Sequence, residues 1–260
     1  MGLGEPQLNS YLEKEEKNKS IHMKIIIAIL LMAISYFIGN ISPATLLARA
    51  HGMDIKKEGS GNAGATNVLR VLGPKAAAIT LVIDVLKGFL ATTFGFFIAY
   101  AIAQRIFDSI FTPADSYATS VSAWCGLAVF IGHIWPILFG FKGGKGVATA
   151  LGVLLSTDYR VALFCLGIFL IIVIATRMVS LGSIVAAIAF PVVFTWWLIK
   201  RGILPSGMGL NVFLYRAIPI LLPLVLMAGI LVFKHRENIK RIIKGEERKL
   251  SFTKNDNNLK

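Results

Sequence analysis

The sequence predicts an all-α fold, a polytopic transmembrane helical bundle of seven helices. Of the 260 residues, 55% are hydrophobic and only 16% are charged, and the mean hydropathy is +0.70. Soluble domains average about 25% charged residues. The hydrophobic residues form long runs, and about 20 helical residues cross a bilayer core of roughly 30 Å. The runs recur too often to be the buried core helices of a soluble protein.

Six apolar runs are predicted as spanning helices. They cover residues 25–47, 76–103, 118–139, 161–176, 181–199 and 217–233. A seventh run, 147–155, is too short to cross alone, because nine helical residues rise only about 14 Å. We interpret it as a short, half-inserted helix, which is tolerated where its ends face protein or a polar cavity. Six spans remain the alternative count.

The two ends of the chain are polar. Residues 1–22 carry mixed charges with little apolar periodicity, and we predict a disordered tail there. The transmembrane domain is then expected over 23–235, with Met23 as a candidate native start. Residues 236–260 are predicted to be a basic cytoplasmic tail.

The distribution of Lys and Arg predicts the orientation. Most of the basic residues outside the spans lie after the first, third and fifth spans and in the C-terminal tail. Basic loops stay in the cytoplasm, so seven spans place the N-terminus outside and the C-terminus in the cytoplasm. The net charge of +13 is then expected to face anionic lipid headgroups. Nucleic-acid binding would need a soluble basic module, which the sequence lacks.

The first chemically specialised segment, residues 56–70, lies on the predicted cytoplasmic side. Its glycines permit positive φ, so that backbone N–H groups can surround an anion. They are Gly59, Gly61 and Gly64. Neutral donors are Ser60, Asn62 and Asn67, and Arg70 can bind a phosphate through two N–H groups. A dinucleotide fingerprint is excluded because no strand precedes these glycines, and a flexible polar loop is the alternative.

The second segment is a glycine-rich turn that leads into the short helix. It contains Gly143, Gly144, Lys145 and Gly146. The spacing departs from that of a P-loop, so it does not predict an ATPase. A helix N-terminus with free N–H groups suits phosphate. Close helix packing through glycine is the alternative.

The third segment follows the last span. In a helix, His235 and Asn238 lie on one face at i, i+3, while most of the neighbouring cations are expected to face headgroups. Ser180, at the start of the sixth helix, could also point into the site. Asp84 and Lys87 are predicted to form an ion pair that supports the first loop, because charge within a span is normally paired or functional.

Several classes of site are not predicted. The histidines, cysteines and acidic residues form no metal-ligand pattern, and no cofactor motif is present. Neither a His-x-x-x-x-Asp pair nor a Gly-x-Ser-x-Gly elbow occurs.

The motifs resemble those of the PlsY family, bacterial acyl-phosphate:glycerol-3-phosphate acyltransferases. The segments are GSGNAGATNVLR, GHIWPILFGFKGGKGVATA, and HRENIKR followed by GEERK, and the resemblance runs from about residue 25 to 250. It implies an enzyme of the bacterial cell membrane (the inner membrane in a Gram-negative cell). Such an enzyme transfers a fatty acyl group from acyl phosphate to the sn-1 hydroxyl of glycerol 3-phosphate at the cytoplasmic side.

The resemblance also implies roles for the site residues. The catalytic residues would be Ser60, Arg70, Lys145, His235 and Asn238. Substrate-binding residues would be Gly59, Gly61, Asn62, Gly64, Asn67, Gly143, Gly144, Gly146, Ser180 and, ahead of Glu246, Glu247. Many members carry two adjacent serines where this chain has Val179-Ser180.

Acyl phosphate is already activated, so we predict no covalent acyl-enzyme. We expect His235 and Asn238 to be orienting donors rather than an acid–base pair. The main alternative is a transporter of a small phosphorylated solute, although no internal repeat is evident. The oligomeric state is not predicted.

Overall fold

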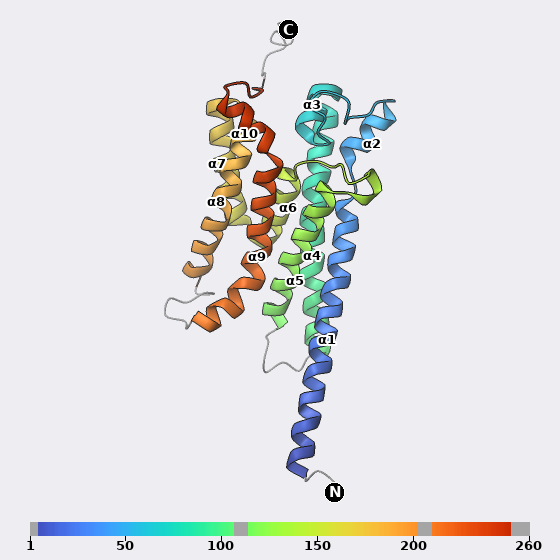
Figure 1. Cartoon of the computed structure of the whole chain (residues 1–260), viewed down its shortest axis with the longest axis vertical. Coiled ribbons are helices and arrows are strands. Elements are labelled where there is room, and N and C mark those ends of the chain that lie inside the picture. The colour runs from blue at the N-terminus through green and yellow to red at the C-terminus, as the bar shows by residue number, and fades with distance from the viewer. Residues whose placement is uncertain (1–4, 107–113, 202–209, 251–260) are drawn as a thin grey trace.

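The protein is an all-helical bundle, described here for residues 5–106, 114–201 and 210–250 of a computed structural model (Figure 1). Over these ranges the chain contains no strand. The helices are α1 (Glu5–Gly39), α2 (Pro43–Ala50), α3 (Ala65–Leu72), α4 (Pro74–Ile106), α5 (Ala114–Ile134), the short 3₁₀ helix η1 (Ile137–Phe139), α6 (Val147–Thr157), α7 (Tyr159–Thr176), α8 (Val179–Lys200), α9 (Leu210–Lys234) and α10 (Arg236–Ile243). Six segments are long and apolar enough to span a membrane, and α6 is a shorter apolar helix. The predicted fold class is confirmed.

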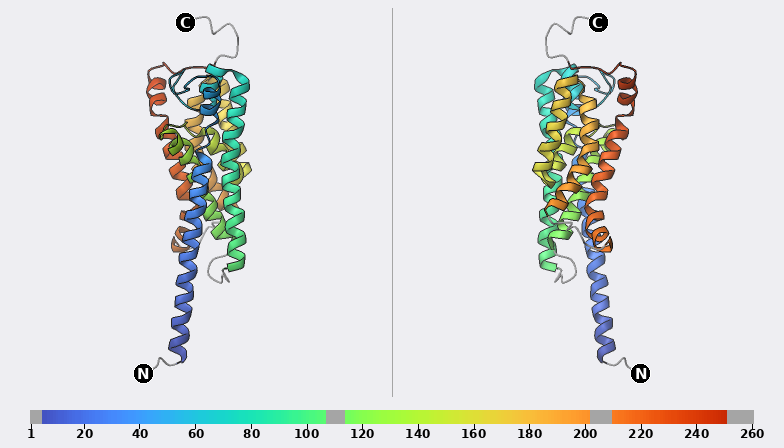
Figure 2. Two further views of the ribbon diagram at one scale, coloured as in Figure 1. Left: turned by 90° about the vertical axis from the view of Figure 1, so that its right-hand side faces the viewer. Right: turned by 90° about the vertical axis from the view of Figure 1, so that its left-hand side faces the viewer.

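The long helices form two groups with α6 between them. Helices α1, α4 and α5 pack together, α7 packs on α8, and α9 contacts both α5 and α8. Helices α2, α3 and α10 gather at one end of the bundle, and α1 extends beyond the other end (Figures 1 and 2). The polar connections that the sequence marks as specialised therefore share one end of the molecule.

The N-terminal segment differs from the prediction. Residues 5–22, which the sequence predicts as a disordered tail, are helical and continue directly into the first span as α1. A helix that is already nucleated extends at little cost, and Lys19 forms an ion pair with Glu15 at 2.7 Å, one turn away. The proposed divisions at residues 22 and 235 stay predictions.

The first predicted span is interrupted rather than continuous. Helix α1 ends at Gly39 and α2 begins at Pro43. Proline has no N–H to continue the ladder and disfavours the helical region for the residue before it, here Ser42, so it favours a new helix start. The Ser42 hydroxyl accepts a hydrogen bond from the Thr45 backbone N–H at 3.4 Å and caps α2. The chain thus turns toward the first specialised loop.

Glycines allow α5 to approach α1 closely, and α6 to approach α4. A Cβ on Gly132 of α5 would overlap the Tyr36 carbonyl of α1, and one on Gly152 of α6 would overlap the Val85 carbonyl of α4. In membranes, where lipid is as apolar as a helix face, such small-residue contacts drive much of the association.

A charged pair lies inside the bundle. Lys87 Nζ is 2.7 Å from Asp84 Oδ1, which confirms the predicted ion pair, and the side chains are 3% and 2% exposed. The Lys87 ammonium also donates to the Ile41 carbonyl at 2.7 Å, in the connection between α1 and α2. The pair therefore holds the connection that precedes the first loop.

Candidate active site

A cavity of about 1060 Å³ opens among the specialised segments. The loop before α3, the glycine-rich turn before α6, and parts of α6 to α10 form its walls. Of the fifteen predicted site residues, all except Gly59 and Gly144 line it. The structure thus brings together residues that lie up to about 190 positions apart in the sequence.

The first loop is shaped by Asn67 at the start of α3. Its side chain is 1% exposed. The Asn67 Oδ1 accepts from the Ser60 N–H at 2.7 Å, and Nδ2 donates to the carbonyls of Ile55 at 3.3 Å and Glu58 at 3.0 Å. These contacts use the amide within the loop, so the geometry favours a positioning role for Asn67 over the predicted substrate contact.

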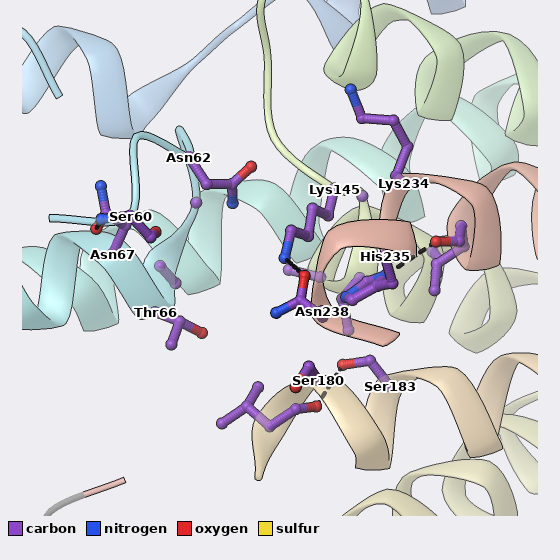
Figure 3. Close-up of a pocket in the computed structure, with 18 of the residues that line it drawn as sticks. Ser60, Asn62, Thr66, Asn67, Lys145, Ser180, Ser183, Lys234, His235 and Asn238 are labelled. Carbon is purple, nitrogen blue, oxygen red and sulfur yellow. Dashed lines mark hydrogen bonds between the residues drawn. The ribbon is translucent and has the colours of Figure 1, made fainter. Parts of the chain in front are cut away.

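Gly59 has a related structural role. Its φ is +60°, a region that favours glycine. A Cβ there would overlap the Asn67 amide oxygen. Gly59 therefore allows the loop to wrap around Asn67 and present Ser60 and Asn62 to the cavity (Figure 3). Arg70 of α3 lines the same cavity.

The glycine-rich turn lies against the end of α5. The Gly143 N–H donates to the Ile134 carbonyl at 3.1 Å, and the Gly144 N–H to the His133 carbonyl at 3.3 Å. A Cβ on Gly144 would overlap both the His133 ring and the Ala63 carbonyl of the first loop. The turn therefore has no room for a side chain at this position, and it carries Lys145 into the cavity.

Helix α10 completes the site through a chain of hydrogen bonds. Lys145 Nζ donates to Asn238 Oδ1 (Figure 3). Asn238 Nδ2 in turn donates to Glu247 Oε1 at 2.7 Å. Ser180 of α8 donates to the same Glu247 oxygen at 2.7 Å, and Arg241 Nε donates to Glu247 Oε2 at 3.0 Å. Glu247 therefore joins α8, α10 and the glycine-rich turn, and the exposed Glu246 beside it does not take part.

The charges in this network are set by burial and by neighbours. Burial lowers the pKa of Lys145 to about 8, an effect that Glu247 partly offsets. Burial opposes the ionisation of Glu247, but hydrogen bonds from Ser180, Asn238 and Arg241 lower the pKa of its carboxyl. At neutral pH the network thus contains a carboxylate and an ammonium.

His235 is 2% exposed and lies at the start of α10. Burial, followed by the charge of Lys145, lowers the pKa of His235 to about 4. Its Nδ1 is 2.8 Å from the Leu231 carbonyl, which can only accept, so Nδ1 carries the proton. The remaining nitrogen, Nε2, is then an acceptor, in contrast to the predicted donor role.

The mouth of the cavity is positively charged. Its lining contains nine Lys and Arg residues and four Asp and Glu residues, which favours anionic ligands. Arg241, which belongs to the Glu247 network, is not among the predicted site residues. The i, i+3 spacing of Arg241 from Asn238 on α10 was the signal that could have found it.

The deeper wall of the cavity is apolar and was not predicted. Residues of α6 to α9 form it, including Leu151, Leu154, Leu166, Phe169, Phe190 and Met227. Ser180 and Ser183 lie side by side on α8 near the boundary between the polar and apolar walls (Figure 3). One cavity therefore offers places for both an anion and an acyl chain.

Comparison with known proteins assigns this arrangement to a family. The family model described as Glycerol-3-phosphate acyltransferase matches residues 29–245. The chain belongs to the glycerol-3-phosphate acyltransferase family. The resemblance noted in the sequence is confirmed, and the transporter alternative is not favoured.

Members of the glycerol-3-phosphate acyltransferase family match over most of their length. The protein of Clostridioides difficile is 37% identical over 89% of this chain and 100% of its own, and that of Geobacter sulfurreducens is 41% identical over 84% and 95%. A crystal structure of PlsY, an integral membrane glycerol 3-phosphate acyltransferase in its glycerol 3-phosphate form, is 34% identical with a TM-score of 0.65. The alignment with that structure covers 86% of this chain and 96% of the PlsY chain. This chain is accordingly a membrane glycerol-3-phosphate acyltransferase.

Proposed function

We propose that the protein transfers a fatty acyl group from acyl phosphate to the sn-1 hydroxyl of glycerol 3-phosphate, giving lysophosphatidic acid and phosphate. The observation that carries the proposal is a single cavity with a basic, glycine-lined mouth and an apolar inner wall. Both proposed substrates contain phosphate, and the donor also contains an acyl chain. PlsY structures in glycerol 3-phosphate and lysophosphatidic acid forms support the acceptor and the product.

We assign the polar groups by their charge and position. Arg70 and Lys145 bind phosphate oxygens and stabilise the charge that develops on them. The side chains of Ser60 and Asn62, which line the cavity, orient the phosphates. The neutral His235 accepts a hydrogen bond at Nε2, while its pKa of about 4 makes it a weak base at neutral pH.

Acyl phosphate needs no nucleophile from the protein. The sn-1 oxygen attacks the acyl carbon and forms the ester, the bond from that carbon to the phosphate oxygen breaks, and the hydroxyl proton leaves with the phosphate. Orientation of two bound substrates can supply roughly 7–11 kcal/mol of the barrier. We therefore propose direct transfer without an acyl-enzyme, and mass spectrometry that detected an acyl group on Ser60 would contradict it.

The reaction is tested with purified protein in detergent, palmitoyl phosphate and glycerol 3-phosphate, by measuring free phosphate and lysophosphatidic acid. We expect equal release of both products, and no lipid product from a glycerol 3-phosphate analogue that lacks the sn-1 hydroxyl. Product formed from acyl-coenzyme A but not from acyl phosphate would overturn the donor assignment. Lys145→Met serves as the inactive control.

We further propose that the site opens to the cytoplasm in a bacterial cell membrane, with anionic headgroups facing the basic surface. The support is the charge distribution of the loops. Both cysteines are free and buried, so Glu246→Cys would offer a single exposed thiol. An impermeant maleimide should label it in inverted vesicles and leave it unlabelled in right-side-out vesicles, and the reverse result would overturn the orientation.

A further inference from the structure

A third polar side chain joins the buried pair in the bundle. His133 of α5 is 6% exposed, and its Nδ1 lies 2.8 Å from Lys87 Nζ and 3.3 Å from Asp84 Oδ1. Lys87 has three N–H donors, and the carbonyl of Ile41, the ring of His133 and the carboxylate of Asp84 lie within 2.8 Å of its nitrogen. Lys87 thus makes two hydrogen bonds, to Ile41 and His133, and an ion pair with Asp84. Its side chain is 3% exposed and is not among the residues that line the cavity.

The pairing also assigns the tautomer of His133. An ammonium can only donate, and Lys87 Nζ, at 2.8 Å, is nearer to Nδ1 than Asp84 Oδ1 is, at 3.3 Å. The shorter contact favours Nδ1 as an acceptor with the proton on Nε2. Nε2 is the ring nitrogen that faces Gly144, since a Cβ there would overlap it. The Nδ1 edge of the His133 ring thus contacts Lys87 and Asp84 of α4, and the Nε2 edge contacts Gly144 of the glycine-rich turn.

His133 contacts that turn through its backbone as well. Its carbonyl accepts the Gly144 N–H at 3.3 Å. Gly144 in turn lies against the Ala63 carbonyl of the first loop, and Lys87 holds the Ile41 carbonyl in the segment leading to that loop. Lys87 and His133, which Asp84 joins, therefore touch the supports of both loops that line the mouth of the cavity.

We propose that Asp84, Lys87 and His133 are positioning residues that set the glycine-rich turn, and through it Lys145, at the glycerol 3-phosphate site. The inference rests on the proposed function. Burying two charges in a membrane span is costly, and an apolar trio could pack α4 against α5 at less cost. Charged and hydrogen-bonding groups additionally fix the ring in one orientation, which the adjacent turn requires.

The test uses variants whose folding can be separated from their activity. Asp84→Asn combined with Lys87→Met removes both charges together and avoids leaving one unpaired. His133→Phe keeps a flat ring and the ion pair but removes both ring nitrogens. The matched control is Ser122→Ala, which breaks a different buried contact between α5 and α4, the 3.1 Å hydrogen bond from Ser122 to the Thr92 carbonyl.

Steady-state kinetics are measured for each substrate, together with the thermal midpoint in detergent. We expect both positioning variants to lower kcat/KM for glycerol 3-phosphate by about 10²-fold, as for a displacement of the order of 1 Å. The KM for acyl phosphate should stay unchanged, and Ser122→Ala should alter only the thermal midpoint.

An unchanged KM and kcat for glycerol 3-phosphate in His133→Phe, or in the double variant, overturns the proposal. An equal rise in the KM of both substrates, or the same kinetic change in Ser122→Ala, also overturns it in favour of a general packing role. Failure of the wild-type protein to form lysophosphatidic acid would instead refute the proposed function, so the two failures are distinguishable.

Discussion

Replacement of Glu247 tests whether α10 is held in its working position by one carboxylate. In Glu247→Ala, the buried donors of Ser180 and Asn238, each at 2.7 Å, lose their acceptor. A hydrogen bond to a charged group contributes about 1.5–3 kcal/mol, so the two losses cost on the order of 4 kcal/mol. With tenfold in rate for each 1.36 kcal/mol, we expect kcat/KM to fall about 10²- to 10³-fold.

A conservative replacement separates these contacts from the ion pair. Glu247→Gln keeps an oxygen for Ser180 and Asn238, and among the hydrogen bonds to this carboxyl it loses only the one from Arg241, whose side chain is 39% exposed. Such a pair contributes at most about 1 kcal/mol, so the expected fall in kcat/KM is about fivefold.

Both variants are assayed by phosphate release with each substrate varied in turn, with Glu246→Ala as the exposed control. A wild-type kcat/KM in Glu247→Ala, or an equal loss of kcat/KM in Glu247→Gln and Glu247→Ala, would refute the role of Glu247 in holding α10.

Three further predictions concern the turn, the pH dependence and the fold. Gly144→Ala places a methyl group against the His133 ring and should raise the KM for glycerol 3-phosphate, whereas Gly229→Ala on α9, in open space, should leave that KM near wild type. Because burial lowers the pKa of Lys145 to about 8, its charge is lost as the pH rises through that value. The KM for glycerol 3-phosphate should therefore rise above about pH 8, and a pH-independent KM in the wild type would contradict this cause. Asp158 caps α7 and accepts from Trp197 Nε1 at 2.7 Å, so Asp158→Ala should lower the free energy of unfolding by about 2 kcal/mol. A thermal midpoint equal to wild type would contradict it.

Much of the fold follows from hydrophobic runs alone. The length of an apolar run is set by bilayer thickness, so the six spans and the short α6 could be predicted from local sequence. The helix over residues 5–22 could not, because polar composition indicates disorder while a preformed span extends the helix. The break between α1 and α2, before Pro43, follows from local chemistry. It was not predicted because apolar residues on both sides of Pro43 form one continuous hydrophobic run.

Part of the candidate site could likewise be predicted from the sequence, and part could not. Glycine, serine and basic residues at close spacing predicted which segments line the cavity, because the flexibility of glycine and the charge of lysine are properties of the residues themselves. The sequence could not distinguish Ser60, which faces the cavity, from Asn67, whose amide hydrogen-bonds the loop backbone. Likewise, the preference for Glu247 over Glu246 gained its physical basis only from the contacts with Ser180 and Asn238.

The sequence by itself determined that this is a helical membrane protein with loops suited to phosphate, since composition, run length and loop chemistry are local. The tertiary structure decided how these parts act together. It placed an apolar wall beside a cationic mouth, gave His235 an acceptor nitrogen through its contact with Leu231, and brought His133 from α5 against the ion pair of α4. The protonation state and the orientation of these side chains depend on neighbouring residues from distant segments of the sequence. Those neighbours are defined only once the helices pack.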